Sequence, residues 1–155
     1  MQLEARVDDL TSQQVQGLVF EHLRGMHANS PPGHVNAFAI EALQSQEVTF
    51  WSIWMGQDLV GCAALKELDT HSGEIKSMRT RPQYLRQGVG QYALDVITGV
   101  ARRRGYRQLL LETGTGEAFD AAHRLYEKNG FQRCGPFGGY AATHFNIFMA
   151  KNLDD

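Results

Sequence analysis

Leu85-Arg86-Gln87-Gly88-Val89-Gly90 joins an extended segment to a helical one and sets the architecture of this 155-residue chain. Residues 74–80 before it have a strand pattern, and the residues after it carry apolar side chains at helical spacing. Glycine lets the backbone take conformations that a Cβ obstructs, and lets a ligand approach closely. The first amides of a helix lack partners within it and lie at the positive end of its dipole. The stretch therefore predicts a phosphate-binding helix start.

Beyond the glycines, helical and extended patterns alternate along the chain. The pattern is helical in residues 89–104 and 119–128, and extended in 106–112, 131–134 and 145–149. The first of these helices ends in Arg102-Arg103-Arg104-Gly105, with cations in the last turn and a glycine beyond, as the dipole and the C-cap favour. Because a helix connects residues 74–80 to residues 106–112, these two strands are predicted to be parallel.

Before the glycines, two helical patterns are followed by an antiparallel meander. Helices are expected near residues 12–26 and 40–43, and strands at 5–7, 49–55, 59–65 and 74–80. The turns at Gly56-Gln57-Asp58 and near residues 69–73 are short enough to pair neighbouring strands antiparallel. The predicted fold class is α+β, a twisted mixed sheet flanked by helices in a single domain over residues 1–155.

Composition and charge exclude several functional classes. The chain is 43% hydrophobic and 21% charged, as globular proteins are, and its net charge of −2 argues against nucleic-acid or membrane-surface binding. The N-terminal residues lack the pattern of a signal peptide, and no apolar stretch approaches the roughly 20 residues that span a bilayer. We therefore expect a cytoplasmic protein with no nucleic-acid or membrane partner.

The cysteines and histidines indicate no metal site. Cys62 and Cys134 lie far apart near predicted strands, so we expect buried, reduced thiols, with a disulfide as the alternative. The six histidines are scattered and none has the spacing of a zinc site, so no metal is predicted.

Two familiar nucleotide-binding motifs do not match the glycine stretch. A P-loop requires Lys and Ser or Thr after its last glycine, whereas Gly90 is followed by Gln91-Tyr92. A dinucleotide-binding fold requires a third glycine three residues further on, after the first strand of a parallel sheet. Ala93 occupies that position here, late in the chain.

The stretch instead resembles the signature of the GNAT superfamily of acyl-CoA-dependent N-acyltransferases. That signature, Gln/Arg-x-x-Gly-x-Gly/Ala, lies between the fourth strand and the third helix of the family. A second element, Ala122-His123-Arg124-Leu125-Tyr126-Glu127-Lys128-Asn129-Gly130-Phe131, is similar to the family's Ala-x-x-x-Tyr-x-x-x-Gly-Phe segment. Leu85 departs from the signature, and Arg86 is the side chain available to compensate. The resemblance covers residues 49–149.

The resemblance implies acetyl-CoA as co-substrate, with its pyrophosphate on the helix start. It also implies that the strand before the loop pairs through its backbone with the pantetheine arm and that one of its amides polarises the thioester carbonyl. The implied cofactor-binding residues are Met78, Arg79, Thr80, Arg86, Gln87, Gly88, Val89, Gly90 and Gln91. Arg81 is a further candidate for a phosphate contact, ahead of the arginines at 102–104, which are more typical of a solvated helix end.

Two catalytic residues follow from the same resemblance. Tyr126 is implied as the acid that protonates the thiolate leaving group, since a phenol with a pKa of about 10 keeps its proton at neutral pH. The alternative is that Tyr126 only packs on its helix face. Glu74 resembles a glutamate base that accepts the proton of the amine. A solvated turn residue is the equally open alternative, and a carbonyl or a water then relays the proton.

The predicted reaction is acetyl transfer to a primary amine by direct attack in a ternary complex. Short loops favour a small-molecule acceptor. A protein N-terminus or lysine as acceptor, and a non-catalytic acyl-CoA-binding module, are the alternatives. The loop at residues 27–36 is a candidate for the acceptor pocket or a simple connection. The sequence identifies no dimer surface, so a homodimer is left as an open alternative.

Overall fold

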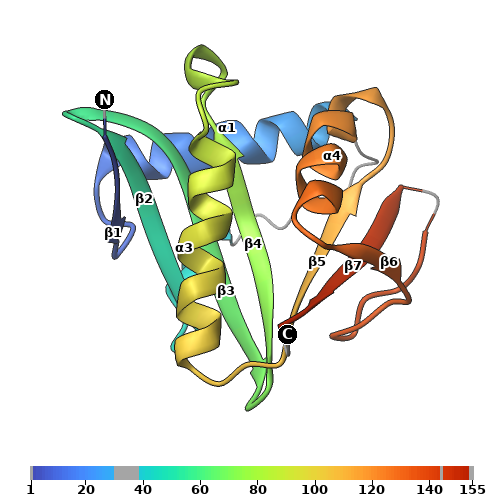
Figure 1. The fold of residues 1–155 in the computed structure, drawn as a ribbon. Coiled ribbons are helices and arrows are strands. Elements are labelled where there is room, and N and C mark those ends of the chain that lie inside the picture. Colours follow the sequence, from blue (N-terminus) through green and yellow to red (C-terminus); the bar gives the residue numbers. More distant parts are fainter. Residues whose placement is uncertain (1, 30–38, 144, 154–155) are drawn as a thin grey trace.

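Seven strands form one sheet in the computed structural model, which describes residues 2–29, 39–143 and 145–153 (Figure 1). Their spatial order is β1-β2-β3-β4-β5-β7-β6. The strands are β1 (Leu3–Val7), β2 (Val48–Met55), β3 (Asp58–Asp69), β4 (Ser72–Thr80), β5 (Gln108–Gly114), β6 (Gln132–Cys134) and β7 (Asn146–Asn152). All neighbours pair antiparallel except β4 and β5, which are parallel as predicted.

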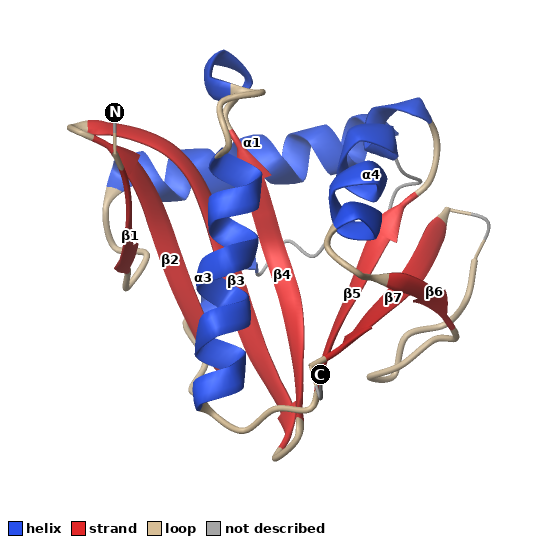
Figure 2. Cartoon of the chain, viewed as in Figure 1, coloured by secondary structure: helices blue, strands red, loops and turns tan. Residues whose placement is uncertain are grey.

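Helices cover both faces of this sheet (Figure 2). They are α1 (Gln13–Asn29), α2 (Ala39–Leu43), α3 (Val89–Arg103) and α4 (Asp120–Lys128), with single 3-10 turns at Pro82–Tyr84 and Glu117–Phe119. The order of elements matches the sequence-based prediction. The predicted α+β class, a mixed sheet flanked by helices, is therefore confirmed.

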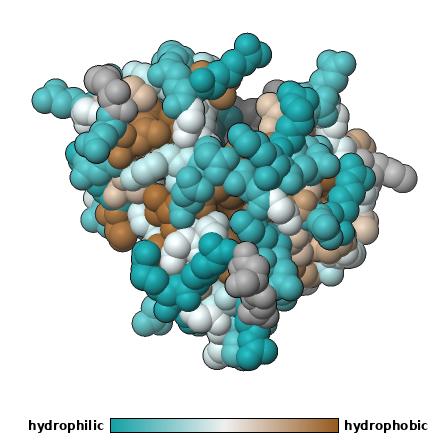
Figure 3. All heavy atoms as spheres, in the orientation of Figure 1, coloured by the Kyte–Doolittle hydropathy of each residue, from teal (hydrophilic) through white to brown (hydrophobic). Residues whose placement is uncertain are grey.

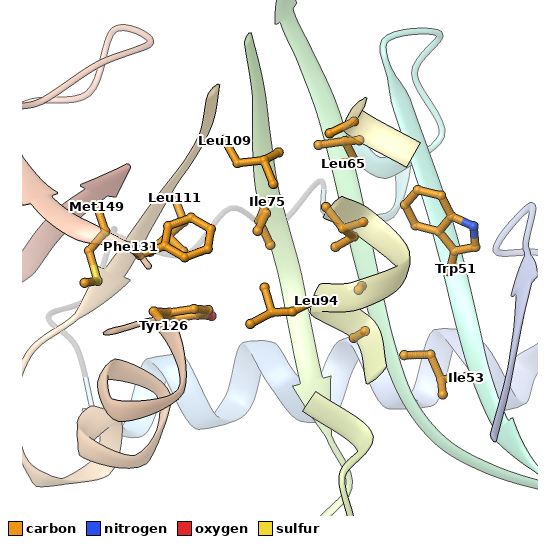
Figure 4. Packing of buried hydrophobic residues seen from close by; sticks show 14 of the residues in the cluster. Trp51, Ile53, Leu65, Ile75, Leu94, Leu109, Leu111, Tyr126, Phe131 and Met149 are labelled. Atoms are coloured by element: carbon orange, nitrogen blue, oxygen red, sulfur yellow. The ribbon is translucent and has the colours of Figure 1, made fainter. Parts of the chain in front are cut away.

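Two apolar cores explain why β3 reads as an almost continuous hydrophobic run. On one face, α3 buries Ala93, Leu94 and Ile97 against the sheet. This core extends from β2 to β7, and Figure 4 shows its side chains between Trp51 and Met149. On the other face, α1 packs a smaller core against β2 and β3. Because both faces of β3 are covered, seven consecutive residues of this strand are buried.

The surface is mixed in polarity, and the two cysteines differ in exposure. Apolar residues reach the face shown in Figure 3 in several separate patches among polar ones. No helix among the described residues is long and apolar enough to cross a membrane. Both cysteines are free, and Cys62 is buried as expected. Cys134 is exposed, so the expectation that both thiols are buried was wrong for this residue. It lies in β6, a three-residue edge strand whose residues are all exposed.

Strand β4 leaves β5 partway along its length. The two strands pair from Ser72–Gln108 to Ile75–Leu111 and no further. Beyond Ile75, β4 carries a bulge. Lys76 pairs with Ala64 of β3 and Arg79 pairs with Cys62, so a step of two residues on β3 is matched by three on β4. Ser77, inside this bulge, has a positive φ of 52°, in the left-handed region. The strands therefore diverge toward the loop that precedes α3 (Figure 1).

Close packing of β3 on β4 predicts opposite effects for two Gly→Ala substitutions. A Cβ at Gly61 would lie 2.7 Å from the Arg79 carbonyl oxygen and 3.0 Å from Val89 Cγ1. Gly61→Ala should therefore lower the free energy of unfolding by about 1–3 kcal/mol. Gly17→Ala, in α1 with nothing within 4 Å, should raise it by up to about 1 kcal/mol. Urea denaturation measures both, and equal effects would contradict this packing.

Candidate active site

The helix start at Gly88 has a backbone conformation that few other residues adopt. Gly88 is the N-cap of α3 with φ 86° and ψ 8°, and Arg86, two residues earlier, has φ 64°. Both values lie in the left-handed region, which glycine enters without steric cost. Val89 is buried in the core and anchors the first turn, whereas residues 85–88 are exposed. The N–H groups of this turn have no partner within the helix.

A cleft of about 570 Å³ opens at this helix start, between β4 and α4. Eight of the nine predicted cofactor-binding residues line it, namely Met78, Arg79, Thr80, Arg86, Gly88, Val89, Gly90 and Gln91. Gln87, the ninth, is exposed beside them. A Cβ at Gly88 would meet no atom within 4 Å, so this position faces open space. Lys128 also lines the cleft and adds a cation that the sequence analysis missed.

Helices α3 and α4 are fastened together beside this cleft. Gln91 and Asn129 exchange two side-chain hydrogen bonds, Gln91 Nε2 to Asn129 Oδ1 at 2.8 Å and Asn129 Nδ2 to Gln91 Oε1 at 2.9 Å. A Cβ at Gly90 would lie 3.0 Å from Leu125 Cδ2, so the helices also approach closely there. The side chain of Gln91 is thus occupied by Asn129, which leaves its backbone N–H for a ligand.

A second cleft of about 210 Å³ lies where β4 and β5 part, and Tyr126 lines both clefts. Met78, Phe119 and Ala122 are shared in the same way. The Tyr126 side chain is buried and packs edge-on against Phe131, with ring centroids 5.7 Å apart. Burial raises the pKa of Tyr126 to about 12. The phenol therefore keeps its proton at the point where the two clefts meet.

Glu74 is buried on β4 and held by two neighbours. The Tyr140 hydroxyl donates to Glu74 Oε2 at 2.7 Å, and Lys76 Nζ lies 3.6 Å from the same oxygen. Lys76 Nζ also donates to the Tyr140 hydroxyl at 3.0 Å. The alternative of a solvated turn residue is wrong, since β4 begins two residues earlier and only 3% of Glu74 is exposed. Burial and the charge of Glu74 raise the pKa of Tyr140.

Tyr140 is a functional candidate that the sequence analysis missed. It lies in the loop between β6 and β7, 66 residues from Glu74. Its ring packs against Phe137 and Phe148, which hold the hydroxyl over β4. The aromatic residue in a glycine-rich loop was visible in the sequence, but nothing local indicated that the loop folds back to β4.

The other arginine candidates lie away from the helix start. Arg81 is not among the residues lining the larger cleft, and its Nε is 3.9 Å from Glu21 Oε2 of α1. The run at residues 102–104 is at the far end of α3, about 22 Å from Gly88 by the rise of a helix. Arg104 donates there to Thr49 Oγ1 at 2.8 Å. The predicted acceptor loop at 27–36 lies largely outside the described residues.

A hollow at the other end of the sheet is equally large, so size alone does not identify the site. It measures about 580 Å³ and is lined by residues from the starts of β4 and β5 and from β6 and β7, among them Arg107, Arg133 and Lys151. It has neither a helix start nor a buried carboxylate among its lining residues. No group of three metal-binding side chains is present in the described residues.

Comparison with known proteins assigns this chain to a family. Residues 18–131 match the model of the acetyltransferase (GNAT) family. The chain is 49% identical to a Bacillus subtilis protein named uncharacterized N-acetyltransferase YsnE, over 97% of this chain and 100% of that protein. The chain therefore belongs to the GNAT family of N-acetyltransferases.

Two further similarities agree with this assignment. A protein of Azospirillum brasilense named IAA acetyltransferase is 35% identical over 74% of either chain. Among solved structures, an acetyltransferase of the GNAT family from Staphylococcus aureus superposes with a TM-score of 0.77 at 19% identity, covering 99% of this chain and 100% of that one. This structure supports the fold alone.

Two glycines at the ends of α3 allow a matched test of the helix start. Gly88 and Gly105 have φ of 86° and 81°, and a Cβ at either meets nothing within 4 Å. Alanine at each position costs about 1–2 kcal/mol of backbone strain, but only Gly88 borders the cleft. Gly88→Ala should weaken acetyl-CoA binding roughly tenfold or more, measured by calorimetry. Gly105→Ala should leave it unchanged, and equal weakening in both would contradict the assignment.

Proposed function

We propose that this protein transfers the acetyl group of acetyl-CoA to the primary amine of a small molecule, and that residues 1–155 act as one domain. The observation that carries the proposal is the junction of two clefts at Tyr126 and Met78, one beginning at a helix start and the other passing between β4 and β5. Such a junction supplies a place where a donor and an acceptor meet.

The helix start fits the pyrophosphate of coenzyme A. Its unpaired N–H groups, the dipole of α3, and the cations Arg86 and Lys128 all favour a doubly charged anion. Arg86, Gln87, Gly88, Val89, Gly90 and Gln91 would hold this group. The free edge of β4 at Met78, Arg79 and Thr80 would pair with the pantetheine arm, since β5 does not pair with these residues. When bound, the thioester supplies an activated acetyl group.

Tyr126 is proposed as the acid. Its ring is fixed by Phe131 and by the core, and its raised pKa keeps the hydroxyl protonated. The position of Tyr126 where the two clefts meet supports a role beside the proposed sulfur site. The buried packing is compatible with the acid role, because the residue also lines both clefts.

Glu74 is proposed as the base that takes the proton of the amine, directly or through a water. It lines the smaller cleft, on the face of β4 opposite α3. The hydrogen bond from Tyr140 fixes one carboxylate oxygen, so the other is available to the amine. The positive charge of Lys76 lies 3.6 Å from the Glu74 carboxylate and offsets its negative charge, which lowers the free-energy cost of burying the carboxylate.

The size of the smaller cleft, about 210 Å³, supports a small acceptor rather than a folded protein surface. The Azospirillum brasilense relative, named IAA acetyltransferase, supports a small molecule as acceptor.

Replacing Tyr126 with Phe tests the acid. Tyr126→Phe should lower kcat about 100- to 10,000-fold and leave the Kd for acetyl-CoA unchanged, as measured by thiol release and calorimetry. Tyr106→Phe is the matched control. Tyr106 is also buried, and its hydroxyl donates a 2.8 Å hydrogen bond to Glu67 Oε1, in a part of the protein outside both clefts. This substitution should cost about 1 kcal/mol of stability and leave kcat unchanged.

The pH dependence adds a second criterion for Tyr126. A phenol with a pKa near 12 is protonated below that pH, so the acid is retained up to pH 10. An unchanged kcat in Tyr126→Phe would remove the acid role, whereas a fall of wild-type kcat above pH 8 that this variant abolishes would contradict the raised pKa.

A parallel pair of substitutions tests the base. Glu74→Gln keeps the shape of the side chain but accepts no proton, so kcat should fall about 100-fold or more. Glu67→Gln is the control, because Glu67 also accepts a hydrogen bond from a tyrosine but lies outside both clefts. If Glu74→Gln retains wild-type kcat from pH 6 to pH 9, a carbonyl or a water relays the proton instead.

A further inference from the structure

Two arginines of the β4 region have a buried Nε–H without a hydrogen-bond partner. These are Arg79, near the end of β4, and Arg81, just beyond it. Neither Nε–H donates a hydrogen bond to another residue in the part of the chain that is described. Both residues are partly buried rather than fully exposed. Buried donors are paired in nearly all native proteins, and an unpaired charged one is costly.

The bulge in β4 determines which way these side chains face. Arg79 is opposite Cys62 on β3, and Cys62 belongs to the core beneath α1. The charge of Arg79 acts on the Cys62 thiol, against the burial that raises its pKa to about 12. Arg81 faces Glu21 of α1. Both guanidinium groups therefore lie on the α1 face of the sheet, opposite α3.

Glu74 and Lys76 lie on the same face, on the other side of the bulge. Lys76 is opposite Ala64, which also belongs to the core beneath α1. Met78, between the two pairs, points to the α3 side and packs against that core. The proposed base and two arginines with an unpartnered Nε–H thus lie on the same face of β4, with the backbone at Met78 between them.

The carboxylates of the described residues do not satisfy these arginines. Glu21 Oε2 is 3.9 Å from Arg81 Nε, which is too long for a hydrogen bond. Glu74 accepts from Tyr140 and pairs with Lys76. A planar guanidinium binds a carboxylate through two parallel hydrogen bonds, and this is the strongest pairing it forms.

We propose that the acceptor is an amine that carries a carboxylate, an amino-acid-like molecule, and that Arg79 and Arg81 bind the carboxylate on the α1 face of β4. This inference rests on the proposed function and deepens it. The α-carbons of these residues are about 6.6 Å apart on an extended strand, a spacing that lets both side chains converge on one anion. The amine end of the acceptor then points along β4 toward Met78 and Glu74.

Matched acceptors test the inference. Amino acids with different separations between amine and carboxylate are compared with their carboxamides, at fixed acetyl-CoA, by following thiol release. The kcat/KM of the best amino-acid acceptor should be at least about tenfold higher than the kcat/KM of the corresponding carboxamide. Arg81→Gln and Arg79→Gln should each raise KM for this acceptor about 10- to 100-fold and largely remove the preference over the carboxamide.

Controls separate this inference from the proposed function. Arg103→Gln, at the exposed end of α3, should keep the preference. Calorimetry with acetyl-CoA shows whether Arg81→Gln is folded and retains its donor site. If carboxamides are acetylated as well as carboxylates, or if both arginine variants keep the preference, the inference is overturned while the transferase stands. If acetyl-CoA binds but no amine is acetylated, the proposed function itself fails.

Discussion

The parting of β4 from β5 is the constraint on which the rest of the structure depends. Parallel pairing stops at Ile75–Leu111, so the residues of β4 beyond this point have no partner on the β5 side. Unpaired backbone groups inside a sheet are costly unless something satisfies them. The bulge at Ser77 and the packing of Gly61 under Arg79 hold β4 in this position. A ligand that pairs with the free edge completes the sheet.

The helix start and the polar network are arranged around this gap. Helix α3 begins where β4 ends, so its unpaired amides lie at the mouth of the cleft. Tyr126 reaches the gap from α4, and Tyr140 reaches it from the loop between β6 and β7. Each of these tyrosines is held by contacts of its ring with other aromatic rings, and these contacts do not involve the hydroxyl. The proposed chemistry therefore depends on elements from four parts of the chain meeting at one break in the sheet.

The fold could be predicted from the sequence because its signals are local. Turn residues, the apolar run of β3 and the glycines around α3 act within a few positions, and they indicated the order of elements and the parallel pair. The cleft at Gly88 followed for the same reason, since a helix start carries its own binding groups. The contacts of Glu74 did not follow, because Tyr140 is 66 residues away and reaches β4 only through tertiary packing. The exposure of Cys134 was likewise set by its place at a sheet edge, which the sequence does not reveal.

The most direct measurement is a crystal structure of the protein with coenzyme A. We expect pyrophosphate oxygens about 2.9 Å from the backbone nitrogens of the first turn of α3, with the pantetheine arm paired to β4 beyond the bulge. A pyrophosphate bound elsewhere, or a helix start closed by protein atoms with the cofactor absent, would contradict it.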